Sequence, residues 1–133
     1  MSNPIATQTP GFLCYAFPDV CKTQVGPAQV PLPYPNSGDL ANAINVSESV
    51  FVQGKPVIRL DSKIPVSTGD EAGALGGVNN DGIVAGEITF TRGSSSVFVN
   101  GKPVVRMFDS TSHNQGNAIG AVQSGDSTVT VAD

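Results

Sequence analysis

A segment of eleven residues occurs twice in the chain, and this internal repeat restricts the fold more than any other feature of the sequence. Residues 49–59 read SVFVQGKPVIR, and residues 96–106 read SVFVNGKPVVR. In each copy, two short valine-rich runs flank a dipeptide that ends in glycine, Gln53-Gly54 or Asn100-Gly101. Such dipeptides are typical of the type I′ turn, which needs positive φ at both central residues. The sequence therefore predicts two β-hairpins, at residues 49–60 and 96–107.

Residues 125–133 resemble a truncated third copy of this unit. GDSTVTV at residues 125–131 matches GSSSVFV, which leads into the second hairpin at residues 93–99. A two-stranded hairpin alone is at best marginally stable in water. We therefore expect one all-β domain over residues 1–133, in which three copies, completed by the proline-rich start, pack around an axis with pseudo-threefold symmetry. The side chains expected near this axis, or their alternates on the strands, are six valines: Val50, Val52, Val57, Val97, Val99 and Val104.

Residues 1–40 contain seven of the ten prolines. Proline fixes its own φ and restricts the preceding residue, so this segment is expected to be extended or polyproline-like, with turns. The prolines alternate with bulky side chains at Pro31, Leu32, Pro33 and Tyr34. We expect this part to form a stiff strap that lies along a sheet edge or on a partner. The alternative is a plain linker. The only helical turn expected lies within residues 39–48, where Asp39 can cap it.

The low charge and acidic pI of the chain bear on which kind of partner it can bind. The chain has 133 residues, a net charge of -4 and only 14% charged residues, and its pI is near 4.7. These values argue against nucleic-acid binding, and the low charge is explained if a partner covers much of the surface. There is no apolar run of about 20 residues to span a bilayer and no secretory signal peptide. We expect synthesis in the cytoplasm, with Cys14 and Cys21 as reduced thiols.

Catalytic motifs are weak in this sequence. His113 is the only histidine, and Cys21 with His113 could in principle form a thiol nucleophile and its base, but no local signature supports the pair. There is no nucleophile elbow, phosphate-binding loop or dinucleotide fingerprint. The spacing of Asp70, Glu71 and Asp81 does not match a calcium loop of the EF-hand type, so a solvated loop is the better interpretation. We expect a protein that is not an enzyme.

A zinc site is the stronger chemical hypothesis. If the hairpins converge at a narrow end, loops from the copies meet there, and His113 could join Cys14 or Cys21 around zinc. A metal would replace the apolar core that a thin tip cannot build. The alternative is a hydrogen-bonded histidine that packs a loop, with two buried free cysteines.

The second hairpin and its continuation, VFVNGKPVVR followed by DSTSH at residues 109–113, resemble the repeat of PAAR domains. AFPDVCKT at residues 16–23, PLPYPN at residues 31–36 and STGDEAG at residues 67–73 are similar to a PAAR-like subfamily whose front segment contains a PIPY motif. The resemblance covers nearly the whole chain. It implies a small conical fold of pseudo-threefold β-hairpins with a proline-rich N-terminal strap.

The resemblance also implies a function, because PAAR proteins cap the trimeric spike of contractile injection systems, chiefly the bacterial type VI secretion system. One copy would sit on a trimer of the valine-glycine repeat protein (VgrG), sharpen it for envelope puncture, and help to load effectors or their chaperones. Such a protein is cytoplasmic before firing and is then carried on the spike into the target cell or the medium, with no stable membrane association. The family's zinc site uses three histidines and one cysteine near the point; here His113 carries over, and Cys21 lies in the front motif.

β-Augmentation is the expected binding mode, because a monomer with threefold repetition can pair its strands with the edges at the end of a trimeric β-helix. The candidate contacts lie on the hairpin strands and the strap: Val50, Val52, Val97, Val99, Pro31, Leu32, Pro33 and Tyr34. Two other classes stay open. One is a small hydrolase or self-cleaving domain that uses Cys21 or His113, and the other is an adhesion module or toxin-loading adaptor outside any injection machine.

Overall fold

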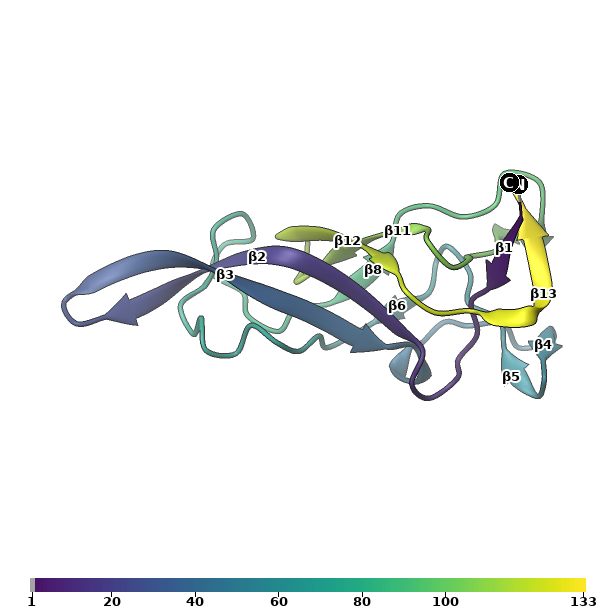
Figure 1. Ribbon diagram of the computed structural model, residues 1–133, viewed down its shortest axis with the longest axis horizontal. Helices are drawn as coiled ribbons and strands as arrows, with labels where there is room; N and C mark the ends of the chain where they lie inside the picture. The colour runs from purple at the N-terminus through teal and green to yellow at the C-terminus, as the bar shows by residue number, and fades with distance from the viewer. Residues whose placement is uncertain (1) are drawn as a thin grey trace.

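The computed structural model describes residues 2–133 and contains thirteen strands and one 3-10 helix (Figure 1). The elements in chain order are β1 (Ser2–Ile5), β2 (Leu13–Val25), β3 (Ala28–Asp39), the 3-10 helix (Leu40–Asn42), β4 (Phe51–Val52), β5 (Lys55–Pro56), β6 (Lys63–Ile64), β7 (Gly76–Gly77), β8 (Ile88–Phe90), β9 (Phe98–Val99), β10 (Lys102–Pro103), β11 (Ser110–His113), β12 (Ala118–Val122) and β13 (Asp126–Ala132). Within this part of the chain, none of the helical structure has the length and apolar character needed to cross a membrane. The predicted all-β fold is confirmed.

Both predicted hairpins form two-stranded antiparallel ribbons, β4–β5 and β9–β10. The first turn has φ values of 51° at Gln53 and 77° at Gly54, and the second has 53° at Asn100 and 79° at Gly101. Positive φ at both central residues is the requirement of the type I′ turn. The local turn chemistry therefore produces the hairpins that the repeat predicts.

The third ribbon joins the two ends of the described chain. Strand β13 pairs antiparallel with β1, and Pro4 of β1 lies opposite Thr130. Pro56 and Pro103 hold the same place in the other ribbons, opposite Phe51 and Phe98. The residues at the start of the chain thus complete the truncated copy at residues 125–133, and the three ribbons lie together at one end of the molecule (Figure 1).

Backbone hydrogen bonds join the three ribbons in a closed ring. Ala6 N–H donates to the carbonyl oxygen of Val105 (3.0 Å), Val105 N–H to that of Ile58 (3.1 Å), and Ile58 N–H to that of Ala6 (3.0 Å). A second set of three hydrogen bonds follows the same cyclic order, with donors two residues further along the chain. Its three bonds run from Gln8 N–H to Pro56 O (2.9 Å), from Leu60 N–H to Pro103 O (2.9 Å) and from Met107 N–H to Pro4 O (2.8 Å). This cyclic order is the pseudo-threefold symmetry that the repeat predicts.

Apolar side chains fill the space between the ribbons. Equivalent positions of the three copies form this small core: Ile5, Val57, Val99, Val104 and Val131, with Val52 partly buried. Of the six valines predicted to pack around the axis, Val50 and Val97 are instead 38% and 37% exposed. On β4 and β9 the side chains that reach the core are Val52 and Val99. Val50 and Val97 each lie two residues earlier, outside the enclosed space.

The remaining strands form a larger sheet in the order β3-β2-β12-β11-β8-β6, and β7 pairs with β2. Its buried side chains include Cys14, Ile88 and Val122, which belong to the main apolar core together with Ile58 and Val105 of the ring. The sheet and the ring of ribbons therefore share one core and form one body.

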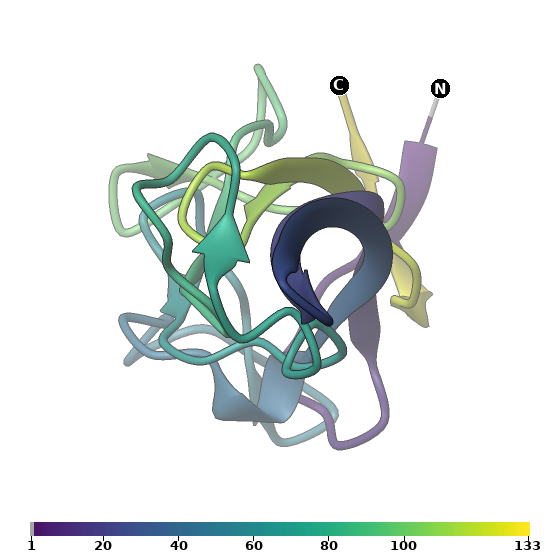
Figure 2. The same cartoon turned by 90° about the vertical axis from the view of Figure 1, so that its left-hand side faces the viewer.

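The proline-rich segment forms both arms of a long twisted hairpin, β2–β3, that extends away from the ribbons (Figures 1 and 2). The predicted extended conformation is confirmed, but the expected strap is one strand of this hairpin. The backbone N–H of Ser37 points away from β2, to the outer edge of β3, and donates to Thr68 O (2.8 Å). Every second residue of a strand points its N–H to the same side, so the positions of Pro31, Pro33 and Pro35 also face outward. Because proline has no N–H, these three residues remove donors from the outer edge of β3.

The helical turn expected within residues 39–48 is confirmed as the 3-10 helix, and the carboxylate of Asp39 caps it by accepting Ala41 N–H at 2.8 Å. Strand β8 begins only at Ile88. Ala85 and Gly86 before β8 instead contact the polar side chains described below.

The small core between the ribbons should dominate the stability of this end of the molecule. Val104→Ala removes two buried methyl groups and leaves a cavity, so we expect a loss of about 2–3 kcal/mol in the free energy of unfolding, measured by urea denaturation. Val66→Ala is the matched control, because Val66 is 68% exposed, and its change should stay within about 0.5 kcal/mol. Equal losses in both variants would contradict the threefold core.

Candidate functional site

Seven polar side chains meet inside the molecule where the long hairpin joins the sheet, and we call them the polar cluster. They come from β2, β3, the segment between the two repeats, the end of β11 and the turn after it: Asp19, Cys21, Asn36, Asp70, His113, Asn114 and Asn117. All are buried, and only Asn117 retains measurable exposure. Buried polar groups of this kind are stable only when they are hydrogen-bonded.

His113 is held at both ring nitrogens. Nδ1 lies 2.8 Å from Oδ1 of Asn36, and Nε2 lies 2.7 Å from Oγ1 of Thr111. Since the Asn36 oxygen can only accept, Nδ1 carries the proton, and Nε2 accepts from the Thr111 hydroxyl. Burial lowers the pKa of His113 from 6.5 to about 4, against a smaller opposing effect of Asp19. The imidazole is therefore neutral near pH 7.

Asp19 is the acceptor at the centre of the cluster. Its Oδ1 accepts from Nδ2 of Asn114 at 3.2 Å and from Nδ2 of Asn117, and the Cys21 thiol donates to it at 3.6 Å. Its Oδ2 accepts from Nδ2 of Asn36 at 3.2 Å. Three amide groups and a thiol thus stabilise one buried carboxylate.

Asp70 lies beside Asp19 and shares the Asn36 amide with it, at 3.4 Å. Burial raises the pKa of Asp70 to about 7, and the hydrogen bond to Asp19 and the charge of Asp19 act in the same direction. Ala85 N–H donates to Oδ1 of Asp70 at 3.1 Å. Burial, followed by the charges of Asp19 and Asp70, also raises the pKa of the Cys21 thiol to about 12.

Asp19, Cys21 and Asp70 each offer one ligand atom, and these atoms lie within 4.8 Å of one another, so the group could hold a metal ion. Of the residues predicted to bind metal, only Cys21 belongs to it. Cys14 lies in the main apolar core, where its thiol donates to Gly38 O at 3.7 Å and burial raises its pKa to about 12. Both cysteines are free and buried. The alternative interpretation, a hydrogen-bonded histidine with two buried free cysteines, is what the structure shows.

The residues present do not fit the zinc site that the PAAR resemblance implies. That site needs three histidines and one cysteine, and the one histidine of this chain, His113, has both nitrogens engaged by Asn36 and Thr111. The hydrogen-bond partners of the Cys21 sulfur are Asp19, Asp70 and Asn114, so the cysteine is not placed beside the histidine as that site requires.

Sequence reasoning found Cys21, His113 and Asp70 as separate candidates but did not bring them together. It assigned Asp70 to a solvated loop with Glu71 and Asp81, and these two side chains are exposed while Asp70 is buried. Asp19, Asn36, Asn114 and Asn117 were missed. Their only signal was position, since Asp19 and Asn36 lie in the front motifs, and Asn114 and Asn117 follow His113.

The catalytic pair of Cys21 and His113 finds no geometric support. The hydrogen-bond partners of the Cys21 sulfur are Asp19, Asp70 and Asn114. A nucleophilic cysteine needs a lowered pKa and access to substrate, whereas this thiol is fully buried with a pKa raised to about 12.

A second candidate site lies on the three ribbons. Val50, Val97 and Val129 hold equivalent positions and are 38%, 37% and 37% exposed. Phe51 and Phe98, on β4 and β9, are also exposed. Within residues 2–133, β4, β9 and β13 each pair on one side only, with β5, β10 and β1. This end therefore presents three open strand edges with apolar side chains in threefold order.

The predicted partner contacts divide between the two ends of the molecule. Val50, Val52, Val97 and Val99 lie on the ribbons, whereas residues 31–34 lie on β3 in the projecting hairpin (Figure 1). Val99 is buried and Val52 is partly buried, so the exposed members of the first group are Val50 and Val97. A flat partner surface could not contact both groups.

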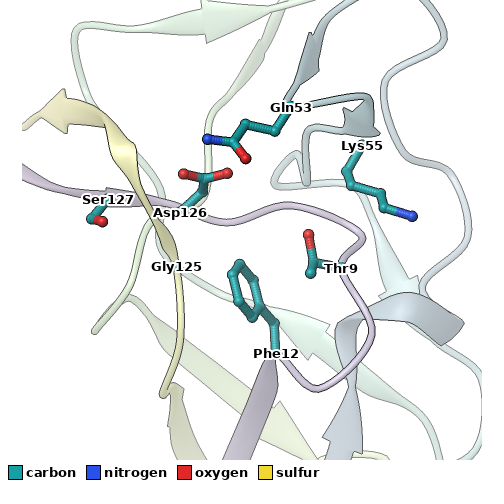
Figure 3. A pocket seen from close by; sticks show the side chains of 7 residues that line it. All are labelled: Thr9, Phe12, Gln53, Lys55, Gly125, Asp126 and Ser127. Carbon is teal, nitrogen blue, oxygen red and sulfur yellow. The ribbon is translucent and has the colours of Figure 1, made fainter.

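The threefold order is broken at one seam between ribbons. Asn100 connects the first and second ribbons by donating to Ser49 Oγ and accepting from Ser47 Oγ, each at 2.8 Å. Ser94 connects the second and third by donating to Ala132 O at 2.5 Å. At the remaining seam lies an open pocket of about 340 Å³ (Figure 3). It is lined by Thr9, Phe12, Gln53, Lys55, Gly125, Asp126 and Ser127.

A family model matches most of the chain. The model of a family described as "Toxin PAAR-like domain" matches residues 12–120, a range that includes both hairpins and the polar cluster. No curated protein and no solved structure matches the chain.

The two titrating groups of the polar cluster should give opposite pH dependences. The raised pKa of Asp70, about 7, means that the folded protein binds this proton more tightly than the unfolded chain, so its contribution to stability is lost as pH rises from about 4 through 7. His113, with a lowered pKa of about 4, contributes stability that is lost as pH falls from about 6.5 through 4.

Asp70→Asn should therefore leave only the histidine dependence. Urea denaturation of the variant between about pH 4 and 8 should show stability rising from pH 4 to about 6.5 and then staying level. The wild type should show a flatter profile, because its two contributions oppose each other. Parallel profiles for the two proteins would contradict the assigned proton on Asp70.

Proposed function

The chain belongs to the toxin PAAR-like domain family, and from this premise we propose that it is a non-enzymatic spike-tip protein. In this proposal it caps and sharpens the trimeric VgrG-type spike of a type VI secretion system or a related contractile injection system. One copy sits on each trimer. It is cytoplasmic before firing and travels on the spike into the target cell or the medium.

The observation that carries the proposal is the closed ring of backbone hydrogen bonds through Ala6, Ile58 and Val105. Through this ring a single chain presents three nearly equivalent ribbons around one axis. A partner with three identical subunits offers three equivalent binding positions, and one monomer can satisfy all of them only if it has this order. The symmetry of the ribbons thus supports a trimeric partner.

β-Augmentation supplies the binding mode. A three-chain β-helix ends in strand edges with unpaired N–H and C=O groups. The open edges of β4, β9 and β13 can pair with them, and the exposed Val50, Val97 and Val129 add apolar contact around the axis.

The opposite end fits the leading point. The β2–β3 hairpin is long and narrow (Figures 1 and 2), and residues 31–34 lie on it, away from the proposed spike contact. Its three alternating prolines leave the open side of β3 poor in donors, so this end resists pairing with other strands. The mechanical role is to transmit the force of contraction to a small area.

Effector loading is the second part of the proposal. Side chains on β2 and β12 leave an apolar surface on the flank of the molecule, between the two ends: Leu13, Tyr15, Phe17 and Ile119. Ile119 is the most exposed of the four, at 80%. Exposed aromatic and aliphatic groups that lie together mark protein contacts. Effectors or their chaperones are the proposed partners there. A toxin-loading adaptor outside an injection machine would use the same surface without a spike.

Val97→Glu tests the spike contact. The substitution places a charge among apolar groups at the proposed interface, so we expect affinity for a trimeric VgrG-type spike protein to fall at least about tenfold. The measurement is titration of the spike trimer with the full chain, followed by mass analysis for a one-to-three complex. Val25→Glu is the matched control, because Val25 is 51% exposed at the tip of the hairpin and should bind like the wild type.

Two outcomes would contradict the proposal. One is the absence of a one-to-three complex between the wild-type chain and a trimeric VgrG-type spike protein. The other is a loss of binding in Val25→Glu but not in Val97→Glu, which would place the spike contact at the hairpin.

A further inference from the structure

The polar cluster has a structural role that is independent of the spike. We propose that it is a metal-free core in which locked asparagine amides, centred on Asp19, take over the structural role that zinc has in PAAR domains.

The three amides are fixed in orientation because their carbonyl oxygens are already bound. Oδ1 of Asn114 accepts Gly86 N–H at 2.8 Å, and Oδ1 of Asn117 accepts Asn79 N–H at 2.8 Å. Oδ1 of Asn36 accepts from His113 at 2.8 Å. A rotation of Asn114 or Asn117 by 180° would set its NH₂ group against a backbone N–H donor. A rotation of Asn36 would set its carbonyl oxygen against the carboxylates of Asp19 and Asp70. The three NH₂ groups therefore stay directed at the carboxylates.

These NH₂ groups occupy the positions that a cation would need. A carboxylate oxygen has two lone pairs, and Oδ1 of Asp19 already accepts from Asn114, Asn117 and Cys21. A metal ion at this atom would have to displace these donors. The NH₂ groups of Asn114 and Asn117 would each keep one acceptor, Ile83 O at 3.1 Å and Val20 O at 2.9 Å, and each would lose a buried hydrogen bond. A protein that held a metal here would direct asparagine oxygens, not nitrogens, toward it.

Close packing of the backbone also limits the space. A Cβ atom on Gly73 would lie 2.5 Å from Cβ of Cys21, and one on Gly77 would lie 2.5 Å from Cγ of Asn117. Two backbone segments thus press directly on the cluster, and glycine is required at both positions. The contacts leave the ligand atoms little freedom to spread around an ion.

The cluster joins segments that are far apart in the sequence, as a structural metal does. Asn117 and Asp19 are 98 residues apart, and His113 and Asn36 are 77 residues apart. Asn36 also donates to Ser67 Oγ at 2.9 Å, which adds the segment between the repeats. These bonds fix both strands of the long hairpin to the sheet at the place where the hairpin leaves the body.

The first test measures metal dependence of the full chain. The protein is unfolded in denaturant with a chelator, refolded with the chelator present, and compared before and after addition of zinc. We expect the same thermal midpoint in all samples and no stoichiometric zinc by elemental analysis. Zinc bound one-to-one together with a higher midpoint would overturn the proposal.

The single histidine gives a direct spectroscopic readout, because only one imidazole contributes signals. Nitrogen-15 chemical shifts at about pH 7 should show His113 as the neutral form with the proton on Nδ1, unchanged by zinc. A proton on Nε2, or shifts that move with zinc, would contradict the assigned hydrogen bonds.

The third test removes one amide. Asn117→Asp keeps the shape but replaces the donor with a carboxylate facing Asp19, and we expect the thermal midpoint to fall by at least about 5 °C in chelator. Asn79→Asp is the matched control, because the Asn79 side chain is exposed and only its backbone N–H contacts Asn117. Its midpoint should change by less than about 2 °C. An unchanged midpoint in Asn117→Asp would overturn the structural role.

Discussion

The architecture depends on closing three weak ribbons into a ring. Each ribbon has only two strands, and an isolated pair of this size is at best marginally stable. Three hydrogen bonds that link Ala6, Ile58 and Val105 in a cycle remove this limitation, because every ribbon then stabilises the next. The apolar residues between the ribbons become buried only after closure. The ring therefore explains why the sequence repeats, and why the residues at its two ends must meet.

The sequence predicted the features that local chemistry controls. Asn100-Gly101 and Gln53-Gly54 encode their turns within two residues, so both hairpins were correct, as was the truncated copy. The valines were harder, because alternation cannot tell Val97 from Val99 at the boundary of a core. The strap was predicted at a sheet edge, where residues 31–34 lie, but the sequence did not show that it is itself a strand of a hairpin. Proline excludes the inner positions of a sheet but permits an edge strand, and only the pairing with β2 decides between a strap and a hairpin.

The polar cluster could be predicted only in part, because polar residues enter a core through tertiary contacts. The chain has only two cysteines and one histidine, so Cys21 and His113 were noticed and suggested a metal site. Asparagines give no such signal, since Asn114 and Asn117 in a short polar segment predict a turn. The structure shows that these residues decide the chemistry of the site. Their bound carbonyl oxygens direct their nitrogens inward, and this arrangement suits a carboxylate rather than a cation.

The two ends of the molecule differ in how their exposed strand edges are built. An open strand edge pairs with any other edge that it meets. At the ribbons, β4, β9 and β13 keep such edges, which is useful only where a defined partner covers them. On β3, prolines at alternate positions remove the outward donors, which suits a strand that must stay unpaired. The polar cluster lies where the hairpin leaves the body and holds its strands to the sheet. A protein with one end that can pair and another that stays unpaired has a direction along its long axis, as the proposed role at the tip of a spike requires.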